Sequence, residues 1–522
     1  MAASSSPPAS LPEPDPKESL ALGAFSVALS FLVFLQRMPG IGPEAFWLDD
    51  LWVAVLARSA SLKELLILPY PAPPGFVLLL KAVAVFAGTH AWAYQLLPLM
   101  VSLILVYFTG WMAGRWTGSL WIALAAVFLA AFNPTLAVYS LRVKSFSMEA
   151  AATVVILAMA WRYMRRPGRA AAACLACGAA LAIPFAFNAV FLGALLAVGL
   201  PLWRLWTAPE VRKEAARETS AALAIYAPLA LLFYLLILRP RSTPALVDYW
   251  RDGYLPVHGM GGIGAFIAGQ GWALMKDAFP FGLSWLALLV PVGIAALLAD
   301  PRRRALGVAA ILFYMELMAA SALHLYPLGR GRTDIFTYPL TQLLAVASLL
   351  WIPKRGRRFL PIIPLLLAVW MLTPGAHVRY KYPESGARAI VERAARLLSP
   401  EDGLVIYPFS NYAAAFYGPW PFHLVPTRQI SHGFYARPDR PLTLAMEDAP
   451  AGVNFNGDPD VLRLQMVRFL SAGPPRIAVI AGRTNPIPMR GIALALEQTG
   501  YRLARREDFP EQSCVLFCRR EP

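Results

Sequence analysis

Residues 118–134 read GSLWIALAAVFLAAFNP, an apolar run without a single charged side chain. A helix that crosses a bilayer needs about 20 mainly apolar residues, so this run predicts a membrane span. Similar runs flank it on both sides, and together they predict about 11 transmembrane helices. The other runs lie near residues 20–36, 93–113, 148–163, 170–184, 186–203, 219–238, 281–299, 305–322, 335–352 and 359–374. The stretch 170–203 fits either two spans or one broken helix.

The composition also favours a membrane protein. Of the 522 residues, 58% are hydrophobic and 15% are charged, against roughly 45–50% and about 25% in ordinary soluble domains. The net charge is +16, but the basic residues fall in short clusters between the apolar runs. This pattern is a topology signal and does not indicate nucleic-acid binding. We therefore expect membrane lipids, and no nucleic acid, among the partners.

The basic clusters predict the orientation, because Lys and Arg are enriched in cytoplasmic loops. Residues 1–19, rich in Ala, Ser and Pro, are expected to be a disordered cytoplasmic tail. The cytoplasmic side should also hold Arg115 and the clusters within 162–169, 204–217, 302–304 and 354–358. The opposite side should hold residues near 40–70, 135–147, 239–280 and 324–334, and everything after 375.

This alternation works only if residues 73–90 do not cross the bilayer. The segment begins with Pro73 and Pro74, contains Lys81 and is short for a span. We interpret it as an interfacial or re-entrant helix.

Residues 375–522 differ from the rest, because strand-like and helix-like patterns alternate there. GLVIYP (403–408), RIAVIAG (476–482) and SCVLFCRR (513–520) are typical of strands, and SGARAIVERAARLL and DPDVLRLQMVRFL of helices. The fold class is therefore a polytopic α-helical membrane protein with a small C-terminal α/β domain. The expected domains are the tail 1–19, a transmembrane domain 20–374 and an extracytoplasmic domain 375–522. The four cysteines imply no disulfide framework.

Two adjacent carboxylates follow the first span. Asp49 and Asp50 stand in an external loop, at the start of an amphipathic pattern. Adjacent carboxylates suit a general base or a metal site, so a divalent metal ion is one expected cofactor. The alternative is a structural role, because Asp also favours helix N-termini.

Basic residues mark two further external loops. The first carries Tyr139, Arg142 and Lys144, and the second, HLYPLGRGRTDIFTYP (324–339), carries Arg330 and Arg332. Guanidinium groups bind phosphate through paired hydrogen bonds, and positive charge is disfavoured on this side of the membrane. Glycines beside the arginines let the backbone approach a ligand. The alternative is anchoring to lipid headgroups. His324 and Tyr326 lie beside the arginines and are candidate substrate contacts, as is Tyr139.

The order of these motifs resembles the membrane glycosyltransferases with the GT-C fold. Relatives of this kind include protein O-mannosyltransferases, the lipid A aminoarabinose transferases and related bacterial sugar transferases. The resemblance covers roughly residues 20–375, with loose motifs. They are WLDD (47–50), PYPAPPGFVLLL (69–80), NPTLAVYSLRVKSFSMEA (133–150) and YPLGRGRTDIFTYP (326–339).

The resemblance implies a transferase in a bacterial inner membrane that uses a polyprenyl-phosphate sugar as donor and inverts the anomeric carbon. Asp49 or Asp50 would activate the acceptor (a glycan, a lipid or another molecule), directly or through a metal. Arg330 and Arg332, with Arg142 or Lys144, would neutralise the donor phosphate.

Two departures from the family pattern bear on the acceptor. Many relatives have Asp-Glu where this chain has Asp49-Asp50, and Ala72 precedes the paired prolines where the protein mannosyltransferases have histidine. A protein acceptor is therefore not supported. The alternative functions are a lipid-linked glycan flippase or transporter, an O-antigen ligase or polymerase, and a noncatalytic scaffold. A requirement for the Asp49 or Asp50 carboxylate would favour the transferase over all of them.

Overall fold

The computed structural model shows two compact units. The first comprises Met1–Pro39, Pro98–Leu236 and Arg251–Tyr380, and the second Gly40–Leu97, Ile237–Trp250 and Lys381–Pro522. The structure describes residues 16–42, 46–256, 260–280, 282–329, 331–353, 355–371, 385–407, 410–427, 433–445, 459–471, 473–482, 486–510 and 512–520.

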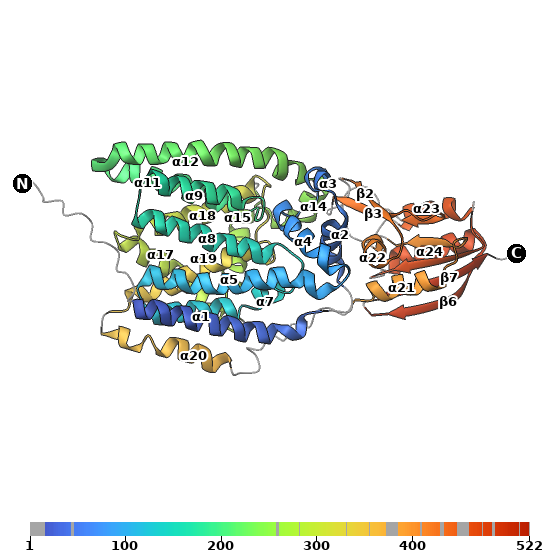
Figure 1. Cartoon of the computed structure of the whole chain (residues 1–522), viewed down its shortest axis with the longest axis horizontal. Coiled ribbons are helices and arrows are strands. Elements are labelled where there is room, and N and C mark those ends of the chain that lie inside the picture. The colour runs from blue at the N-terminus through green and yellow to red at the C-terminus, as the bar shows by residue number, and fades with distance from the viewer. Residues whose placement is uncertain are drawn as a thin grey trace, which may run out of the picture. The chain divides into compact units, whose positions relative to one another are not determined.

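The first unit is helical, and its long helices run side by side (Figure 1). At its centre, α6 (Leu120–Ala131) is buried from Ile122 to Ala131 and packs against α1, α19 and α20. Ser119 caps the start of α6 by accepting a hydrogen bond from the Ile122 N–H. The other helices are α1 (Pro16–Arg37), α5 (Ala91–Thr117, which begins in the second unit), α7 (Pro134–Tyr139), α8 (Phe146–Arg165), α9 (Arg169–Ala182), α10 (Ala189–Gly193), α11 (Gly199–Thr207), α12 (Arg212–Phe233), α15 (Met260–Phe266), α16 (Trp272–Lys276), α17 (Leu289–Ala299), α18 (Arg304–Ala322), α19 (Tyr338–Ala347) and α20 (Ile362–Met371).

Short 3₁₀ and π segments connect or continue several of these helices. They are η1 (Met38–Gly40), η2 (Ala194–Val198), η3 (Pro209–Val211), η4 (Tyr234–Leu238), η5 (Arg251–Gly253), η6 (Ile267–Gly271), η7 (Ser284–Leu288), η8 (Ile335–Thr337), η9 (Ser348–Trp351) and η10 (Gly356–Phe359).

Five helical segments of the described residues are long and apolar enough to cross a membrane. They are Leu20–Gly40, Ala91–Thr117, Ala189–Thr207, Pro209–Arg241 and Arg304–Ala322. The other predicted spans also coincide with helical segments, several of them shorter apolar helices such as Leu120–Ala131 and Arg169–Ala182. The mainly helical fold is therefore confirmed, while the number of 11 spans stays a prediction. The stretch 170–203 contains two helices, α9 and the segment that starts at Ala189.

Helix ends that carry the basic clusters are joined by hydrogen bonds in the first unit. Arg303 Nε donates to the carbonyl of Trp116 at 2.5 Å, which brings the end of α5 to the start of α18. Arg204 and Tyr163 both donate to the buried Glu218, at 2.5 and 2.6 Å. These bonds bring Arg115 close to the cluster 302–304, and the cluster 162–169 close to 204–217, while the membrane side of the clusters stays a prediction.

The second unit combines the segment after the first span with the C-terminal residues. Segment 73–90, predicted to form an interfacial or re-entrant helix, contains α4, whose 14 residues are short for a span. Helix α4 packs against α2. The helices of this unit are α2 (Leu48–Ser59), α3 (Leu62–Ile67), α4 (Pro74–Ala87), α13 (Arg239–Arg241), α14 (Pro244–Tyr249), α21 (Ala387–Leu397), α22 (Ser410–Tyr417), α23 (Pro459–Ser471) and α24 (Pro486–Gln498).

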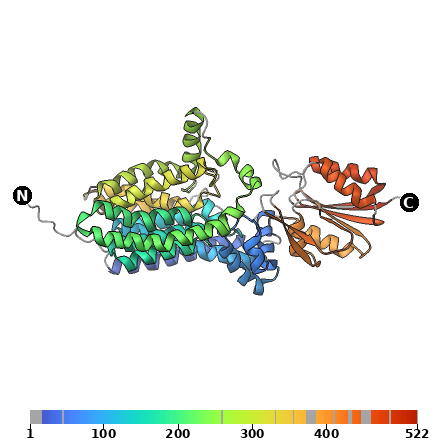
Figure 2. The same ribbon diagram turned by 90° about the horizontal axis from the view of Figure 1, so that it is seen from above.

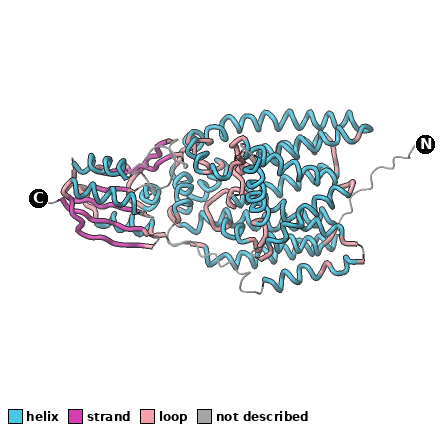
Figure 3. Tube along the Cα trace, turned by 180° about the vertical axis from the view of Figure 1, so that it is seen from behind, coloured by secondary structure: helices cyan, strands magenta, loops and turns pink. Residues whose placement is uncertain are grey.

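The strands of the described residues all lie between 403 and 520 (Figure 3). A five-stranded sheet has the order β4-β1-β5-β7-β6, with β1 parallel to β4 and β5 and with β7 antiparallel to β5 and β6. Helices α23 and α24 cover one face and α21 the other (Figure 2). The strands are β1 (Gly403–Ile406), β4 (Thr443–Ala445), β5 (Arg476–Ala481), β6 (Tyr501–Phe509) and β7 (Ser513–Arg520), and β2 (Phe422–Pro426) and β3 (Phe434–Pro438) form a separate antiparallel hairpin.

Candidate functional site

The paired carboxylates lie in the first turn of α2. The N-cap is Trp47, so Asp49 and Asp50 occupy the second and third helical positions and do not cap the helix themselves. Their charges complement the positive end of the helix dipole there. Asp50 is completely buried, whereas Asp49 is partly exposed. The more accessible carboxylate is thus Asp49.

The C-terminal domain holds the start of α2. The Phe46 N–H donates a hydrogen bond of 2.7 Å to the hydroxyl of Tyr417, at the end of α22. Burial raises the pKa of Tyr417 above its ordinary value, and the negative charge of Asp50 adds to the rise. Tyr417 therefore stays a protonated phenol beside the carboxylates at neutral pH.

Aromatic rings and a guanidinium extend this contact. The rings of Phe46, Tyr94 and Phe416 lie 5.6 to 5.8 Å apart, centroid to centroid. Arg58, in the last turn of α2, donates to the Phe416 carbonyl at 2.6 Å and lies over its ring at 5.6 Å. Both ends of α2 are therefore tied to α22, within the second unit.

A buried arginine fixes the segment between α3 and α4. Arg241 is 3% exposed and donates to the carbonyls of Ile237 and Leu65, both at 2.8 Å. Its guanidinium lies 4.6 Å from the ring centre of Tyr70, whose hydroxyl also donates to Leu65. Our reading of the sequence missed Arg241. The signal was present, because Arg241 is an arginine at the end of a long apolar helix, on the predicted extracytoplasmic side, where positive charge is disfavoured.

The hairpin β2–β3 lies against the same segment. Gly433, just before β3, has φ +78°, and a Cβ atom there would come within 2.3 Å of the Pro69 carbonyl oxygen. Only glycine permits both the backbone conformation and the close approach. The C-terminal domain therefore contacts the loop after α3 as well as α2.

In the first unit, the loop after α6 is anchored at both ends. Asn133 caps α7 and donates to the Asp277 carbonyl at 3.0 Å. At the other end, the Ser147 hydroxyl donates to the Tyr139 carbonyl at 3.0 Å, and the rings of Tyr139 and Phe146 pack edge to face. The two cationic residues lie between these anchors, with Arg142 5% exposed and Lys144 partly exposed.

The second cationic loop, residues 324–339, forms hydrogen bonds within itself. The Tyr326 hydroxyl donates to the Thr333 carbonyl at 2.8 Å, and the Tyr338 hydroxyl donates to the Gly331 carbonyl at 3.2 Å. Arg332, between these bonds, is partly exposed. The predicted Arg330 lies outside the described residues.

The two glycines of this loop differ. Both have positive φ, but a Cβ on Gly329 would come within 2.0 Å of the Gln270 side chain, while a Cβ on Gly331 would meet nothing. Gly329 thus allows a close approach of the loop to η6, and Gly331 leaves open space beside Arg332.

The helix that follows the first cationic loop packs beside the second cationic loop. Helix α8 packs on η8, which follows directly after Arg332 and Asp334. Burial raises the pKa of Tyr326 far above its ordinary value, with further contributions from the charges of Glu149, in the first turn of α8, and of Asp334. One phenol is thus close to an acidic group of α8 and to one of the second loop. The ends of the two cationic loops therefore lie close together.

The remaining predicted residue, His324, is exposed, with φ +56°. Its ring lies 4.9 Å from that of Tyr254. The structure therefore gives Tyr326 a role in holding its loop and leaves His324 accessible. Asp49 and Asp50 belong to the second unit, and the cationic loops to the first.

The described residues contain no group of three or more His, Cys, Asp and Glu side chains placed to hold a metal ion. The pair Asp49 and Asp50 would need further oxygen ligands from water or substrate to complete such a site. A divalent metal ion at this pair stays a prediction.

No protein-family model matches the chain, and no curated protein matches it. A solved structure, ArnT from Cupriavidus metallidurans bound to undecaprenyl phosphate, aligns with 95% of this chain and 97% of its own, at a TM-score of 0.55 and 14% sequence identity. The apo structure of that ArnT aligns with 96% of this chain and 98% of its own, at a TM-score of 0.46 and 16% identity. At such low identity the first match shows the fold alone. The chain therefore has the fold of ArnT, the lipid A aminoarabinose transferase, which is the GT-C fold of membrane glycosyltransferases.

Proposed function

We propose that this protein is a membrane glycosyltransferase that moves a sugar from a polyprenyl-phosphate donor to an acceptor on the extracytoplasmic side. The observation that carries the proposal is the packing of α8, which follows the loop with Arg142 and Lys144, on η8, which follows the loop with Arg332. The ArnT structure of the same fold was solved with undecaprenyl phosphate bound, which supports a lipid-phosphate ligand for this chain as well.

The cationic loops would act on the departing phosphate. As the bond between the anomeric carbon and the phosphate oxygen breaks, negative charge grows on the lipid phosphate. Arg332 and Arg142 present planar donors that suit two phosphate oxygens at once, and Lys144 adds a point charge. Arg330 is proposed to join them, from its place beside Arg332 in the sequence.

The carboxylates would act on the acceptor. Asp49 is partly exposed at the start of α2, so it would act as the general base that accepts the proton of the acceptor hydroxyl. The hydroxyl oxygen then bonds to the anomeric carbon on the side opposite the phosphate, and the configuration inverts. Asp50 is completely buried and close to Tyr417, so it positions the turn that carries Asp49.

The C-terminal domain would lie on the same side of the membrane as the transfer reaction. Helix α22 contacts α2 directly, so the domain lies on whichever side of the membrane holds Asp49. The basic clusters assign the opposite side to the cytoplasm. We therefore propose an extracytoplasmic C-terminal domain on a multi-pass protein of a bacterial inner membrane.

Sugar transfer in isolated membranes tests this function. Labelled sugars on undecaprenyl phosphate are supplied, and wild type is compared with Asp49→Asn, Asp50→Asn and Arg332→Ala at matched expression. Asp508→Asn, on the exposed strand β6, and Arg169→Ala, at the start of α9, serve as charge-matched controls. We expect Asp49→Asn to lose at least about 100-fold in rate, Arg332→Ala to lose transfer through weaker donor use, and both controls to match wild type.

A second measurement keeps the test decisive when the right sugar is absent. Undecaprenyl phosphate should raise the Tm of purified wild-type protein and raise that of Arg332→Ala less. Equal rates in wild type and all site variants, or no response of wild type to the lipid phosphate, would contradict the proposal.

A further inference from the structure

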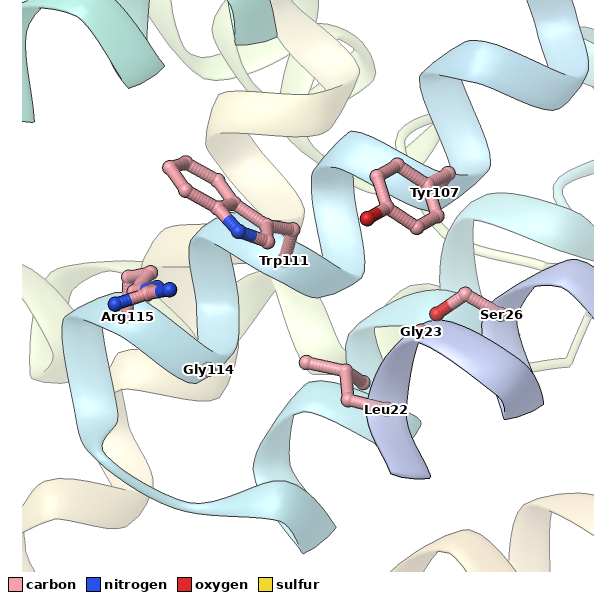
Figure 4. A pocket seen from close by; sticks show the side chains of 7 residues that line it. All are labelled: Leu22, Gly23, Ser26, Tyr107, Trp111, Gly114 and Arg115. Carbon is pink, nitrogen blue, oxygen red and sulfur yellow. The ribbon is translucent and has the colours of Figure 1, made fainter. Parts of the chain in front are cut away.

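A cavity of about 190 Å³ lies between α1 and α5, and Figure 4 shows Ser26, Tyr107 and Arg115 in its wall. None of its lining residues comes from the two cationic loops. A carboxylate that lies beside those loops comes instead from the end of α16. This is Asp277, in the stretch 239–280 that is predicted to be external.

The end of α16 is fixed against the end of α6. Asn133, which follows α6, donates a hydrogen bond of 3.0 Å from its side chain to the Asp277 carbonyl. Gln342 of α19 donates to the next carbonyl, that of Ala278, at 2.6 Å, and to the Leu129 carbonyl at 3.3 Å. The backbone at residues 277 and 278 is therefore held where the chain enters the first cationic loop.

Tyr338 connects the same place to the second cationic loop. Its hydroxyl accepts a hydrogen bond from Thr135, two positions after Asn133, and donates to the Gly331 carbonyl at 3.2 Å. The negative charge of Asp277 is close enough to act on this phenol. Asp277 therefore lies beside residues of both cationic loops, all of them in the first unit.

The Asp277 carboxylate can accept further hydrogen bonds. The Lys276 ammonium lies 4.0 Å from it, which is too long for a hydrogen bond. The Asp277 side chain is 39% exposed, and within the described residues no donor bonds to its oxygens. Burial raises the pKa of Asp277, and the charge of Lys276 opposes that rise, so the carboxyl group is partly withdrawn from water. An ionised carboxylate has about four lone-pair sites for donors.

The second cationic loop leaves room for a ligand beside Tyr338. Gly331 has φ +67°, and a Cβ atom there would meet no atom within 4 Å. Arg332 follows directly and is partly exposed. Open space, a cation and an accessible carboxylate thus lie near one phenol.

We propose that Asp277 binds hydroxyl groups of the donor sugar, beside the cationic residues that hold the donor phosphate. The inference rests on the proposed sugar transfer and adds a residue that selects the sugar. Asp277 and the phosphate repel each other, so the uncharged sugar is the part of the donor that suits this carboxylate. Sugars offer neighbouring hydroxyl donors, and one carboxylate accepts from two of them at once. A site built to bind a hydroxyl rejects a ligand that lacks it, because the buried acceptor is then left unpaired.

Native mass spectrometry of the purified full chain tests this contact. Bare undecaprenyl phosphate is titrated in parallel with undecaprenyl-phosphate glucose, mannose and arabinose, and the donor that wild type binds most tightly is used for the variants. Asp277→Asn should bind that donor at least about tenfold more weakly than wild type, because charge-assisted hydrogen bonds to the sugar are lost. It should bind bare undecaprenyl phosphate at least as tightly as wild type, because a repelling charge is removed. Glu210→Gln, which changes an exposed carboxylate of η3 in the same unit, is the charge-matched control and should match wild type with both lipids.

Three results would overturn the inference. They are unchanged binding of the sugar donor by Asp277→Asn, equal weakening of the donor and the bare lipid, and a wild type that binds all three donors no more tightly than bare undecaprenyl phosphate. Each leaves the proposed transfer function standing. A wild type that does not bind bare undecaprenyl phosphate would contradict that function, and the inference with it.

Discussion

The backbone N–H of Phe46 and the hydroxyl of Tyr417 form a hydrogen bond of 2.7 Å across 371 positions of the chain. Phe46 comes just before α2, and α2 carries Asp49 and Asp50 in its first turn. The C-terminal domain thereby fixes where that turn begins. A domain that looks like a separate appendage in the sequence is part of the support for the proposed base.

Tyr417→Phe should show whether the hydrogen bond to the Phe46 N–H positions Asp49 for transfer, in addition to its effect on folding. The change leaves the Phe46 N–H without its acceptor, which costs about 1–3 kcal/mol for a buried donor. We expect the protein to fold with a Tm lower by several degrees and the rate of transfer to fall about tenfold, at unchanged KM for the donor. Tyr234→Phe, on η4, is the matched control and should alter neither value. A Tyr417→Phe enzyme with full activity would show that the bond does not position Asp49.

Gly433→Ala should detach the hairpin β2–β3 from the loop after α3. The new Cβ would lie within 2.3 Å of the Pro69 carbonyl oxygen, and a positive φ adds about 1 kcal/mol for any L-residue. Gly500→Ala is the control, because Gly500 also has positive φ but has open space around it. We expect thermal unfolding to show a decrease in Tm at least twice as large for Gly433→Ala as for Gly500→Ala. Equal decreases in Tm would mean that the backbone at Pro69 shifts at little cost to make room for the new Cβ atom.

Arg241→Gln should destabilise the protein, because Arg241 holds the segment between α3 and α4. It removes hydrogen bonds to the Leu65 and Ile237 carbonyls and the contact with the Tyr70 ring. We expect a loss of about 2–4 kcal/mol in the free energy of unfolding. Arg239→Gln, two positions earlier and exposed, should change it by less than about 0.5 kcal/mol. Chemical unfolding in detergent measures both, and similar values for the two variants would refute the structural role.

Acid should weaken the C-terminal domain through Glu507. Arg393 in α21 donates two hydrogen bonds to the Glu507 carboxylate, at 2.8 and 2.9 Å, and this lowers the pKa of Glu507 below its ordinary 4.5. Because the folded-state pKa is the lower one, the stabilisation is present above pH 4.5 and is lost as the pH falls through the folded-state pKa. Tm should therefore drop less between pH 6 and pH 3 for Glu507→Gln than for wild type. Glu497→Gln, an exposed residue of α24, should follow the wild-type curve.

Local pattern was enough to predict most elements of the C-terminal sheet. Strands β1 and β5 are apolar and almost fully buried, so their sequences stand out. Strand β6 was missed, because as the edge strand it pairs on one side only and reads YRLARREDF, rich in charge. Edge strands tolerate charge, which removes the alternation that marks a strand in the sequence.

The parts of the candidate site could be proposed from the sequence. Arg142, Lys144 and Arg332 were chosen because they are basic residues on the predicted extracytoplasmic side, a signal that each loop carries by itself. Tyr417 and Gly433 carry no such signal. Their importance comes from contacts with Phe46 and Pro69, which lie hundreds of positions away.

The sequence by itself determined the membrane-spanning architecture and the α/β character of the C-terminal domain. Both follow from local composition, because lipid selects apolar helices and a buried sheet selects apolar strands. Only the tertiary structure decided that α8 and η8, which follow the two cationic loops, pack together and that the C-terminal domain holds α2. Such contacts depend on shape and hydrogen-bond geometry between distant segments, and no property of either segment alone specifies its partner.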